Sequence, residues 1–145
     1  MEKIWVLAGD TSCARVFATD RRNGDLEEQF DLVNPEARLH ERELTSDLPG
    51  RTANSATRTR HGYGGEDTKK HHATTRFARE ISERLEKARI QGKWEKLYIV
   101  ADPSFLGELR KCLDPDTAQR VTGEVDKNLA RGTAADVRRV LPDFL

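Results

Sequence analysis

The chain has 145 residues, of which 25 are basic and 25 acidic, so its formal net charge at neutral pH is zero. This length is typical of one domain that buries its own core. The neutral balance excludes a global basic field that would draw the whole surface onto nucleic acid, so any anion site must come from local clustering. We therefore expect a single domain over residues 1–145.

Three short β-like stretches open the chain, at residues 3–8, 14–18 and 26–33. A Gly-Asp-Thr-Ser turn separates the first two, and Asn23-Gly24, a strong hairpin signal, separates the next two. The third stretch alternates loosely and places Leu26, Phe30 and Leu32 on one face. These patterns predict an antiparallel meander of three strands.

Residues 45–66 differ from the rest, because Gly, Ser, Thr, Asn and Arg dominate them and no periodicity is present. We expect a long flexible loop there, since loops of this length are usually functional or disordered. Apolar residues then recur at helical spacing from Phe77 to Ala88, which predicts a long helix that stops near Gly92. On that helix, two Glu–Lys/Arg pairs at i,i+4 spacing are expected to form ion pairs, Glu80 with Arg84 and Glu83 with Lys87.

The last third of the chain alternates strand and helix signals. Residues 96–101 predict a buried strand beside the first one, and residues 121–125 predict another. Acids precede prolines at Asp102 and Asp114, and Thr133 with Asp136 resembles a capping box, so three helix starts are expected. The order predicts an α/β fold, in which a mixed five-stranded sheet combines an antiparallel three-strand meander with βα units and carries helices on its faces.

Several of these stretches together resemble one family. They are WVLAGDTSCARVF, VNPEARLHERELTSDLPGR, TTRFAREISERLEKAR, KLYIVADPSFLGELRKCL and TGEVDKNL, in that order. They resemble the bacterial host-attachment family, proteins required for attachment to host cells, from Lys3 to about Leu141, and most specifically over residues 42–51. The family label implies a role in attachment, which we expect to be indirect.

A more distant resemblance concerns His61-Gly62-Tyr63-Gly64-Gly65-Glu66 and the later run at residues 76–79, Arg-Phe-Ala-Arg. Both are similar to the middle domain of archaeal and eukaryotic class-1 peptide chain release factors. That resemblance implies a ribonuclease-H-like, ribosomal-protein-like topology and contact with the ribosome or tRNA. Glu66 stands where the Gly-Gly-Gln motif has glutamine, and a glutamate is charged and only accepts hydrogen bonds. We therefore expect no peptidyl-tRNA hydrolysis.

The best functional signal is the stretch from Gly50 to His72, which holds five basic and two acidic residues. Its glycines let the backbone approach a ligand, and Tyr63 is suited to stacking on a base. The predicted RNA- or phosphate-binding residues are Arg51, Arg58, Arg60, His61, Tyr63, Gly64, Gly65, Lys69 and Lys70. The alternative is a solvated loop that binds nothing.

A second cluster lies just upstream and is a candidate anion pocket, made by Arg38, His40, Arg42 and Asp47. In it the aspartate would orient an arginine. Surface ion pairs with neighbouring glutamates explain the same residues equally well, and such pairs contribute little.

Asp10 and Asp102 follow two strands that we expect to be neighbours, and paired carboxylates at such an edge can hold Mg²⁺ for hydrolysis of RNA or an ester. The competing interpretation is structural, a turn at Asp10 and a helix cap at Asp102, and we favour it. No cofactor or metal motif is present, and Cys13 and Cys112 are expected to be reduced, buried thiols.

The N-terminal apolar run spans only five residues, too short for a signal peptide or a membrane span, so we expect a cytoplasmic location without membrane insertion. The sequence thus favours a binding module for RNA or the ribosome over an enzyme. An indirect attachment factor and a metal-dependent hydrolase remain the alternatives.

Overall fold

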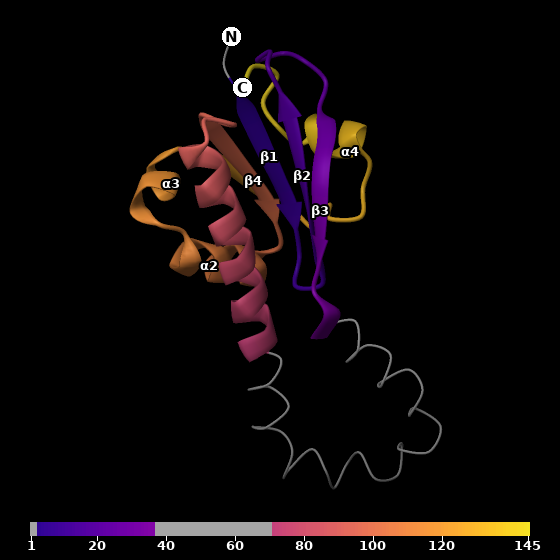
Figure 1. Cartoon of the computed structure of the whole chain (residues 1–145). Coiled ribbons are helices and arrows are strands. Elements are labelled where there is room, and N and C mark those ends of the chain that lie inside the picture. Colours follow the sequence, from indigo (N-terminus) through magenta and orange to yellow (C-terminus); the bar gives the residue numbers. More distant parts are fainter. Residues whose placement is uncertain (1–2, 37–70) are drawn as a thin grey trace, which may run out of the picture.

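The structure of the protein, a computed structural model, describes residues 3–36 and 71–145. Five strands form one sheet in the order β3-β2-β1-β4-β5 (Figure 1). The strands are β1 (Ile4–Gly9), β2 (Cys13–Thr19), β3 (Glu27–Val33), β4 (Lys96–Ala101) and β5 (Val121–Asp126). The helices are a long one over residues 71–90, α2 (Pro103–Cys112), α3 (Pro115–Gln119) and α4 (Ala134–Arg139).

The sheet is mixed, as predicted. β1 pairs with β2, and β2 with β3, in antiparallel orientation, which forms the expected meander. β4 lies parallel to β1 on its other side, and β5 continues the sheet parallel to β4. This arrangement confirms the predicted α/β class with a five-stranded mixed sheet, and its strand order is compatible with a ribonuclease-H-like topology.

Helices cover both faces of the sheet, so β1 and β4 are buried almost throughout. On one face, alternate strand residues such as Leu7 and Ile99 pack against the long helix and α2, through Ile81 and Phe105 among others. On the opposite face, Val6, Tyr98 and Val100 pack with α4 and the C-terminal residues. Strands buried on both faces read as continuous apolar runs, which is why these two were recognisable in the sequence.

The helix ends follow the expected chemistry with one exception. Thr133 and Asp136 form a reciprocal capping box, and Asp114 accepts a hydrogen bond from the backbone N–H of Thr117. Gly92 has φ +76°, the left-handed conformation that ends the long helix. Asp102 occupies the cap position of α2, but its side chain makes no cap hydrogen bond.

One local prediction is wrong. The β2–β3 hairpin forms as predicted, through a connection over residues 20–26 in which Gly24 N–H closes a turn onto the Arg21 carbonyl. Leu26 therefore precedes the strand and packs on the α4 face, whereas Phe30 and Leu32 pack on the other.

The two ion pairs predicted along the long helix do not form either. Arg84 places its guanidinium over the ring of Phe30, 4.4 Å from the centroid, and among the described residues neither Arg84 nor Lys87 lies within ion-pair distance of a carboxylate. An exposed i,i+4 pair contributes only about 0.3–0.5 kcal/mol, whereas a cation–π contact contributes about 0.5–1 kcal/mol. The aromatic ring therefore competes successfully for the arginine.

Candidate functional site

Asn34 follows β3 at the end of the sheet where β1 and β4 terminate, and its side chain is buried. It connects the end of β3 to the first described turn of the long helix. Its Nδ2 donates to the carbonyls of Thr11, at 3.0 Å, and Ala73, at 3.3 Å. Its backbone N–H donates to the carbonyl of Ser12 at 2.8 Å. One amide thus fastens together the β1–β2 turn, the residues after β3 and the first described turn of the long helix.

Charged groups add a second connection at the same place. Arg76 on the long helix forms an ion pair with Glu36. Glu108 on α2 accepts a hydrogen bond from Thr75 at 3.4 Å and lies 3.6 Å from the imidazole of His71. Residues 36 and 71 are therefore held at one edge of the fold, so the segment between them begins and ends there.

The carboxylate of Asp10 accepts four hydrogen bonds at this edge of the fold. Its Oδ1 accepts from Ser12 N–H, Ser12 Oγ–H and Cys13 N–H at 2.8, 2.8 and 2.9 Å, and its Oδ2 accepts from Asn128 at 3.3 Å. Burial raises the pKa of the Asp10 carboxyl, but these hydrogen bonds outweigh it and hold the pKa below its ordinary value of 3.8. Asp10 is thus ionised at neutral pH and shapes the turn, which is the structural role favoured from the sequence.

Asp102 follows β4 and is the neighbour of Asp10 across the parallel pair, since Gly9 faces Ala101. Its Oδ2 accepts from Ser104 Oγ–H at 2.8 Å, whereas Oδ1 is buried without a hydrogen-bond partner among the residues that the structure describes. Across the same residues, no group of three or more His, Cys, Asp or Glu side chains gathers that would hold a metal ion.

The two cysteines are free thiols, half-buried rather than buried as expected. Burial and then the negative charge of Asp10 raise the pKa of the Cys13 thiol above 9.0, and burial raises the pKa of the Cys112 thiol. Because the thiolate is the nucleophile, both groups are poor ones at neutral pH.

A second candidate lies at the opposite end of β1, and the sequence patterns did not find it. Two adjoining hollows, of about 560 and 660 Å³, share Trp5, Gln29 and Lys93 in their linings. The larger one is also lined by Phe30, Arg84 and Lys87. The sequence does contain a sign of this site, because Arg84 and Lys87 lie at i,i+3 spacing on one helix. Since each also follows a glutamate at i,i+4 spacing, the pattern predicted an ion pair for each of them instead.

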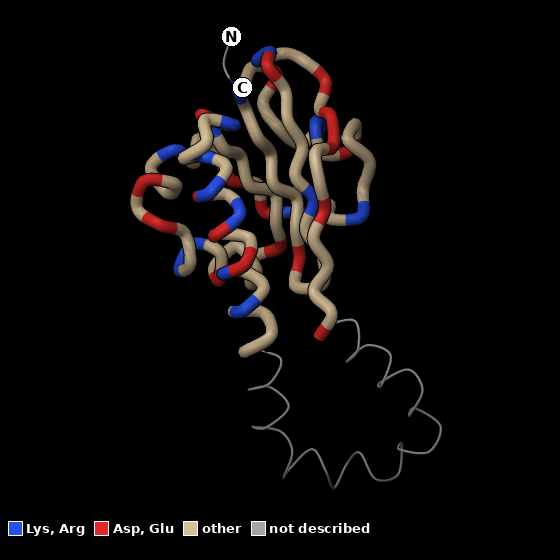
Figure 2. The backbone as a smooth tube through the Cα atoms, viewed as in Figure 1, with Lys and Arg blue, Asp and Glu red and all other residues tan. Residues whose placement is uncertain are grey.

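Charge over the described part is otherwise mixed. Figure 2 shows basic and acidic residues mixed on the helices, whereas β1 carries neither and β3 carries only acidic ones. Several oppositely charged neighbours pair directly, such as Arg110 with Glu124 at 2.6 Å and Arg15 with Glu28 at 2.6 Å. None of the helices in residues 3–36 and 71–145 is long and apolar enough to cross a membrane.

The profile of a family described as "protein required for attachment to host cells" matches residues 5–141. The chain belongs to this family. The host-attachment resemblance inferred from the sequence is therefore confirmed over nearly its whole extent, whereas no curated protein matches the chain.

Among solved structures, this host-attachment chain is similar to an archaeal translation termination factor, aRF1, with 12% sequence identity and a TM-score of 0.45. The similarity covers 94% of this chain and 37% of that one, so the host-attachment chain spans little more than a third of the release factor's length.

The binding residues predicted for the host-attachment chain lie outside the described residues. This holds for the cation-rich set, Arg51, Arg58, Arg60, His61, Tyr63, Gly64, Gly65, Lys69 and Lys70, and for the candidate anion pocket, Arg38, His40, Arg42 and Asp47. The expected loop at residues 45–66 lies there too. The structure does bring Asp10 and Asp102 to neighbouring strand ends, as predicted, and adds Asn34 and Glu108, whose roles no local pattern indicates.

Proposed function

We propose that this host-attachment-family chain is a binding module for RNA or the ribosome that acts inside the bacterial cell. The observation that carries the proposal is the charge of residues 50–72, five basic and two acidic residues in a chain of zero net charge. A local excess of cations attracts nucleic-acid phosphates, and glycines and Tyr63 suit close approach and stacking. The sequence resemblance of residues 61–66 and 76–79 to release-factor middle domains supports the same class of partner.

The described geometry is consistent with this use of the segment. Asn34 and the Glu36–Arg76 ion pair hold the described residues on either side of residues 37–70, which include most of the cation-rich stretch, at one edge of the sheet. A segment whose ends are already fixed has less chain entropy to lose on binding than a free tail. In the proposal, the contact residues are Arg51, Arg58, Arg60, His61, Tyr63, Gly64, Gly65, Lys69 and Lys70, with Arg38, His40, Arg42 and Asp47 as an adjoining anion pocket.

The test compares two triple variants of the full chain by the salt dependence of binding to labelled single-stranded RNA and by co-sedimentation with ribosomes. One variant removes Arg58, Arg60 and Lys69. The matched control removes three exposed cations of the described surface, Arg110, Lys111 and Arg139. The first should lower the slope of log K against log salt by about two, at about 0.7 per lost phosphate contact. The control should leave it unchanged, and equal retention of RNA by the first variant and the native chain would overturn the proposal.

The alternative within the same family is an indirect attachment factor that does not bind RNA. It rests on the family's description, a protein required for attachment to host cells. If deletion of the gene reduces attachment while the Arg58, Arg60 and Lys69 triple variant restores it fully, attachment does not depend on RNA binding and this alternative is favoured.

A metal-dependent hydrolase is the lesser alternative, and one observation favours it. Asp102 keeps a buried Oδ1 without a partner among the described residues, beside Asp10 on the adjacent strand. A hydrolytic activity that requires added Mg²⁺ and disappears in both Asp10→Asn and Asp102→Asn would support it. Activity that survives one of these changes would remove that acid from the mechanism, and activity that survives both would rule out this alternative.

A further inference from the structure

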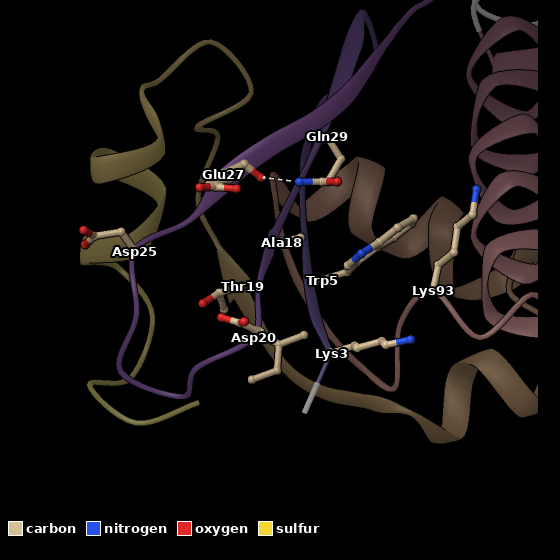
Figure 3. A pocket seen from close by; sticks show the side chains of 10 residues that line it. Lys3, Trp5, Ala18, Thr19, Asp20, Asp25, Glu27, Gln29 and Lys93 are labelled. Atoms are coloured by element: carbon tan, nitrogen blue, oxygen red, sulfur yellow. Dashed lines mark hydrogen bonds between the residues drawn. The ribbon is translucent and has the colours of Figure 1, made fainter. Parts of the chain in front are cut away.

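The groove between β3 and the last turns of the long helix is lined by several polar side chains that have no hydrogen-bond or ion-pair partner among the described residues. Trp5 is 6% exposed and lies at its floor, stacked on Trp94 at 6.4 Å and edge-on to Phe30 at 5.7 Å. Figure 3 shows the smaller hollow, where the indole of Trp5 lies near Gln29 and Lys93. The aromatic cluster gives this groove a rigid floor, because its rings are packed into the core.

The two tryptophans of the cluster differ in their hydrogen bonding. Trp94 is 1% exposed, and its Nε1–H donates to the carbonyl of Leu85 at 2.9 Å. Trp5 Nε1–H donates to no residue in the described part of the chain. This N–H is not among the buried side-chain atoms that lack a partner, so it is open to the groove and to solvent. Since Trp5 lines both hollows, an acceptor on a ligand in the groove would satisfy this donor.

Three cations line the larger hollow, namely Arg84, Lys87 and Lys93, and no acid is present among the described residues that line it. None of the three forms an ion pair with a carboxylate among the described residues. Phe30 holds the face of the Arg84 guanidinium, which leaves its N–H donors directed outward from the ring edge. Lys87, one turn further along the helix, adds its charge beside Arg84. The lining of the larger hollow therefore favours an anion.

The smaller hollow has the opposite character, because Asp20, Asp25 and Glu27 line it together with Lys3 and Lys93. Carboxylates repel a second phosphate but accept hydrogen bonds from hydroxyl and amino groups. Gln29 lines both hollows; its amide nitrogen donates to the Glu27 carbonyl at 3.3 Å, which leaves its side-chain oxygen as an acceptor. The two hollows thus suit one ligand that is anionic at one end and a polar hydrogen-bonding group at the other.

We propose that this groove binds a nucleotide, either free or as one unit of single-stranded RNA. Its phosphate lies against Arg84, Lys87 and Lys93, and its base and sugar lie over Trp5 and Gln29 towards the carboxylates. The volume of about 660 Å³ falls in the range of small-ligand sites. The RNA source rests on the proposed function, whereas the free nucleotide does not.

The chain itself supplies the probe for the test, because its two tryptophans are both part of this aromatic cluster. The full chain is titrated with adenosine 5′-monophosphate, adenosine, inorganic phosphate and a short single-stranded oligoadenylate, and the tryptophan emission is followed. The monophosphate should change the emission at concentrations at which adenosine and phosphate separately do not.

The decisive variant is Arg84→Gln with Lys87→Gln, two exposed side chains whose loss leaves the core intact. It should weaken binding of the monophosphate about tenfold or more, since charge-assisted hydrogen bonds are lost. The matched control is Arg139→Gln on α4, whose side chain is 75% exposed on the other face of the sheet. Trp5→Phe, followed by calorimetry, should weaken binding while preserving the ring stack.

The outcomes separate this inference from the proposed function. Binding of the monophosphate that depends on Arg84 and Lys87, without any RNA binding, supports the groove with a free nucleotide and contradicts the proposed function. Binding of the oligoadenylate that the groove variant weakens supports the RNA source. RNA binding that the groove variant leaves unchanged removes the RNA source and places RNA elsewhere on the chain. No response to millimolar monophosphate overturns the inference and leaves the proposed function standing on its own test.

Discussion

The two ends of β1 use their polar groups in opposite ways. At the carboxyl end, Asp10 and Asn34 direct their hydrogen bonds at neighbouring backbone groups, and the buried Asp102 Oδ1 is the exception that has no partner among the described residues. At the other end, Arg84, Lys87 and the Trp5 indole make no hydrogen bond or ion pair with the described residues. Groups that are satisfied internally stabilise the fold, whereas groups left unsatisfied beside a hollow are available to a ligand.

The same contrast separates two arginines of similar chemistry. Arg138 donates to the carbonyls of Arg22, Gly24, Pro142 and Asp143, at distances from 2.7 to 3.3 Å, and so ties the β2–β3 connection to the C-terminal residues. Arg84 rests on Phe30 alone. Substitutions in the two sets should therefore have different consequences: lost stability at the first and lost binding at the second.

Asn34→Asp should have the largest effect on stability. It replaces the amide donor with a carboxylate that faces the carbonyls of Thr11 and Ala73 in a buried site. An unpaired buried charge facing acceptors should lower the free energy of unfolding by about 3–4 kcal/mol at pH 7, measured by urea titration.

The matched variant Asn34→Ala removes the donor without adding a charge and should cost about 2 kcal/mol. The new carboxyl would have a folded pKa above its unfolded one, so the deficit of Asn34→Asp should shrink as pH falls, because a protonated carboxyl donates again. A pH-independent deficit equal to that of the alanine variant would show that the amide does not clamp the two segments.

Arg138→Gln should come next, at about 2 kcal/mol in the same titration, because the four hydrogen bonds from its guanidinium to backbone carbonyls are lost, although Leu145 N–H still donates to the carbonyl of Arg22. Arg138→Lys should recover only part of the loss, since an ammonium cannot reproduce the planar fork. Full recovery by lysine would mean that charge, rather than the directed hydrogen bonds, holds the C-terminal residues.

Asp10→Asn should cost less, about 1 kcal/mol at pH 7, because the amide oxygen can still accept from Ser12 and Cys13 while the charge is lost. Hydrogen bonds lower the folded pKa of Asp10 below 3.8, so its carboxylate contributes stability above that value and loses it as the pH falls through the folded pKa. The difference between the native chain and Asp10→Asn should therefore vanish in strong acid. A difference that persists there would assign the effect to packing.

The sequence predicted the sheet well because its buried strands and helices carry continuous or periodic apolar patterns. The helix ends at Gly92 and Thr133 were predictable for the same local reason, since a left-handed residue and a capping box act within one turn. Leu26 was misplaced because its face depends on where the turn ends, which alternation alone does not determine.

The candidate sites show where local patterns stop being informative. The proximity of Asp10 and Asp102 followed from parallel strand pairing and is confirmed, while the cation-rich residues 50–72 remain a prediction. The groove was missed because Trp5, Phe30 and Arg84 come from three separate elements and meet only in the folded chain. Helical spacing indicated a glutamate partner for Arg84, and the tertiary structure supplied an aromatic ring instead.

The double variant Arg84→Gln with Lys87→Gln should have the smallest effect on stability. A small effect is expected because these side chains are available to a ligand and do not hold the fold together. Both side chains are exposed, and the only interaction lost among the described residues is the contact between Arg84 and Phe30, about 0.5–1 kcal/mol. Removing two adjacent like charges offsets part of that cost. The free energy of unfolding should therefore change by less than about 0.5 kcal/mol, and the unfolding transition should stay as cooperative as in the native chain. A loss approaching that of Arg138→Gln would show that these cations stabilise the fold, as Arg138 does, and are not available to a ligand.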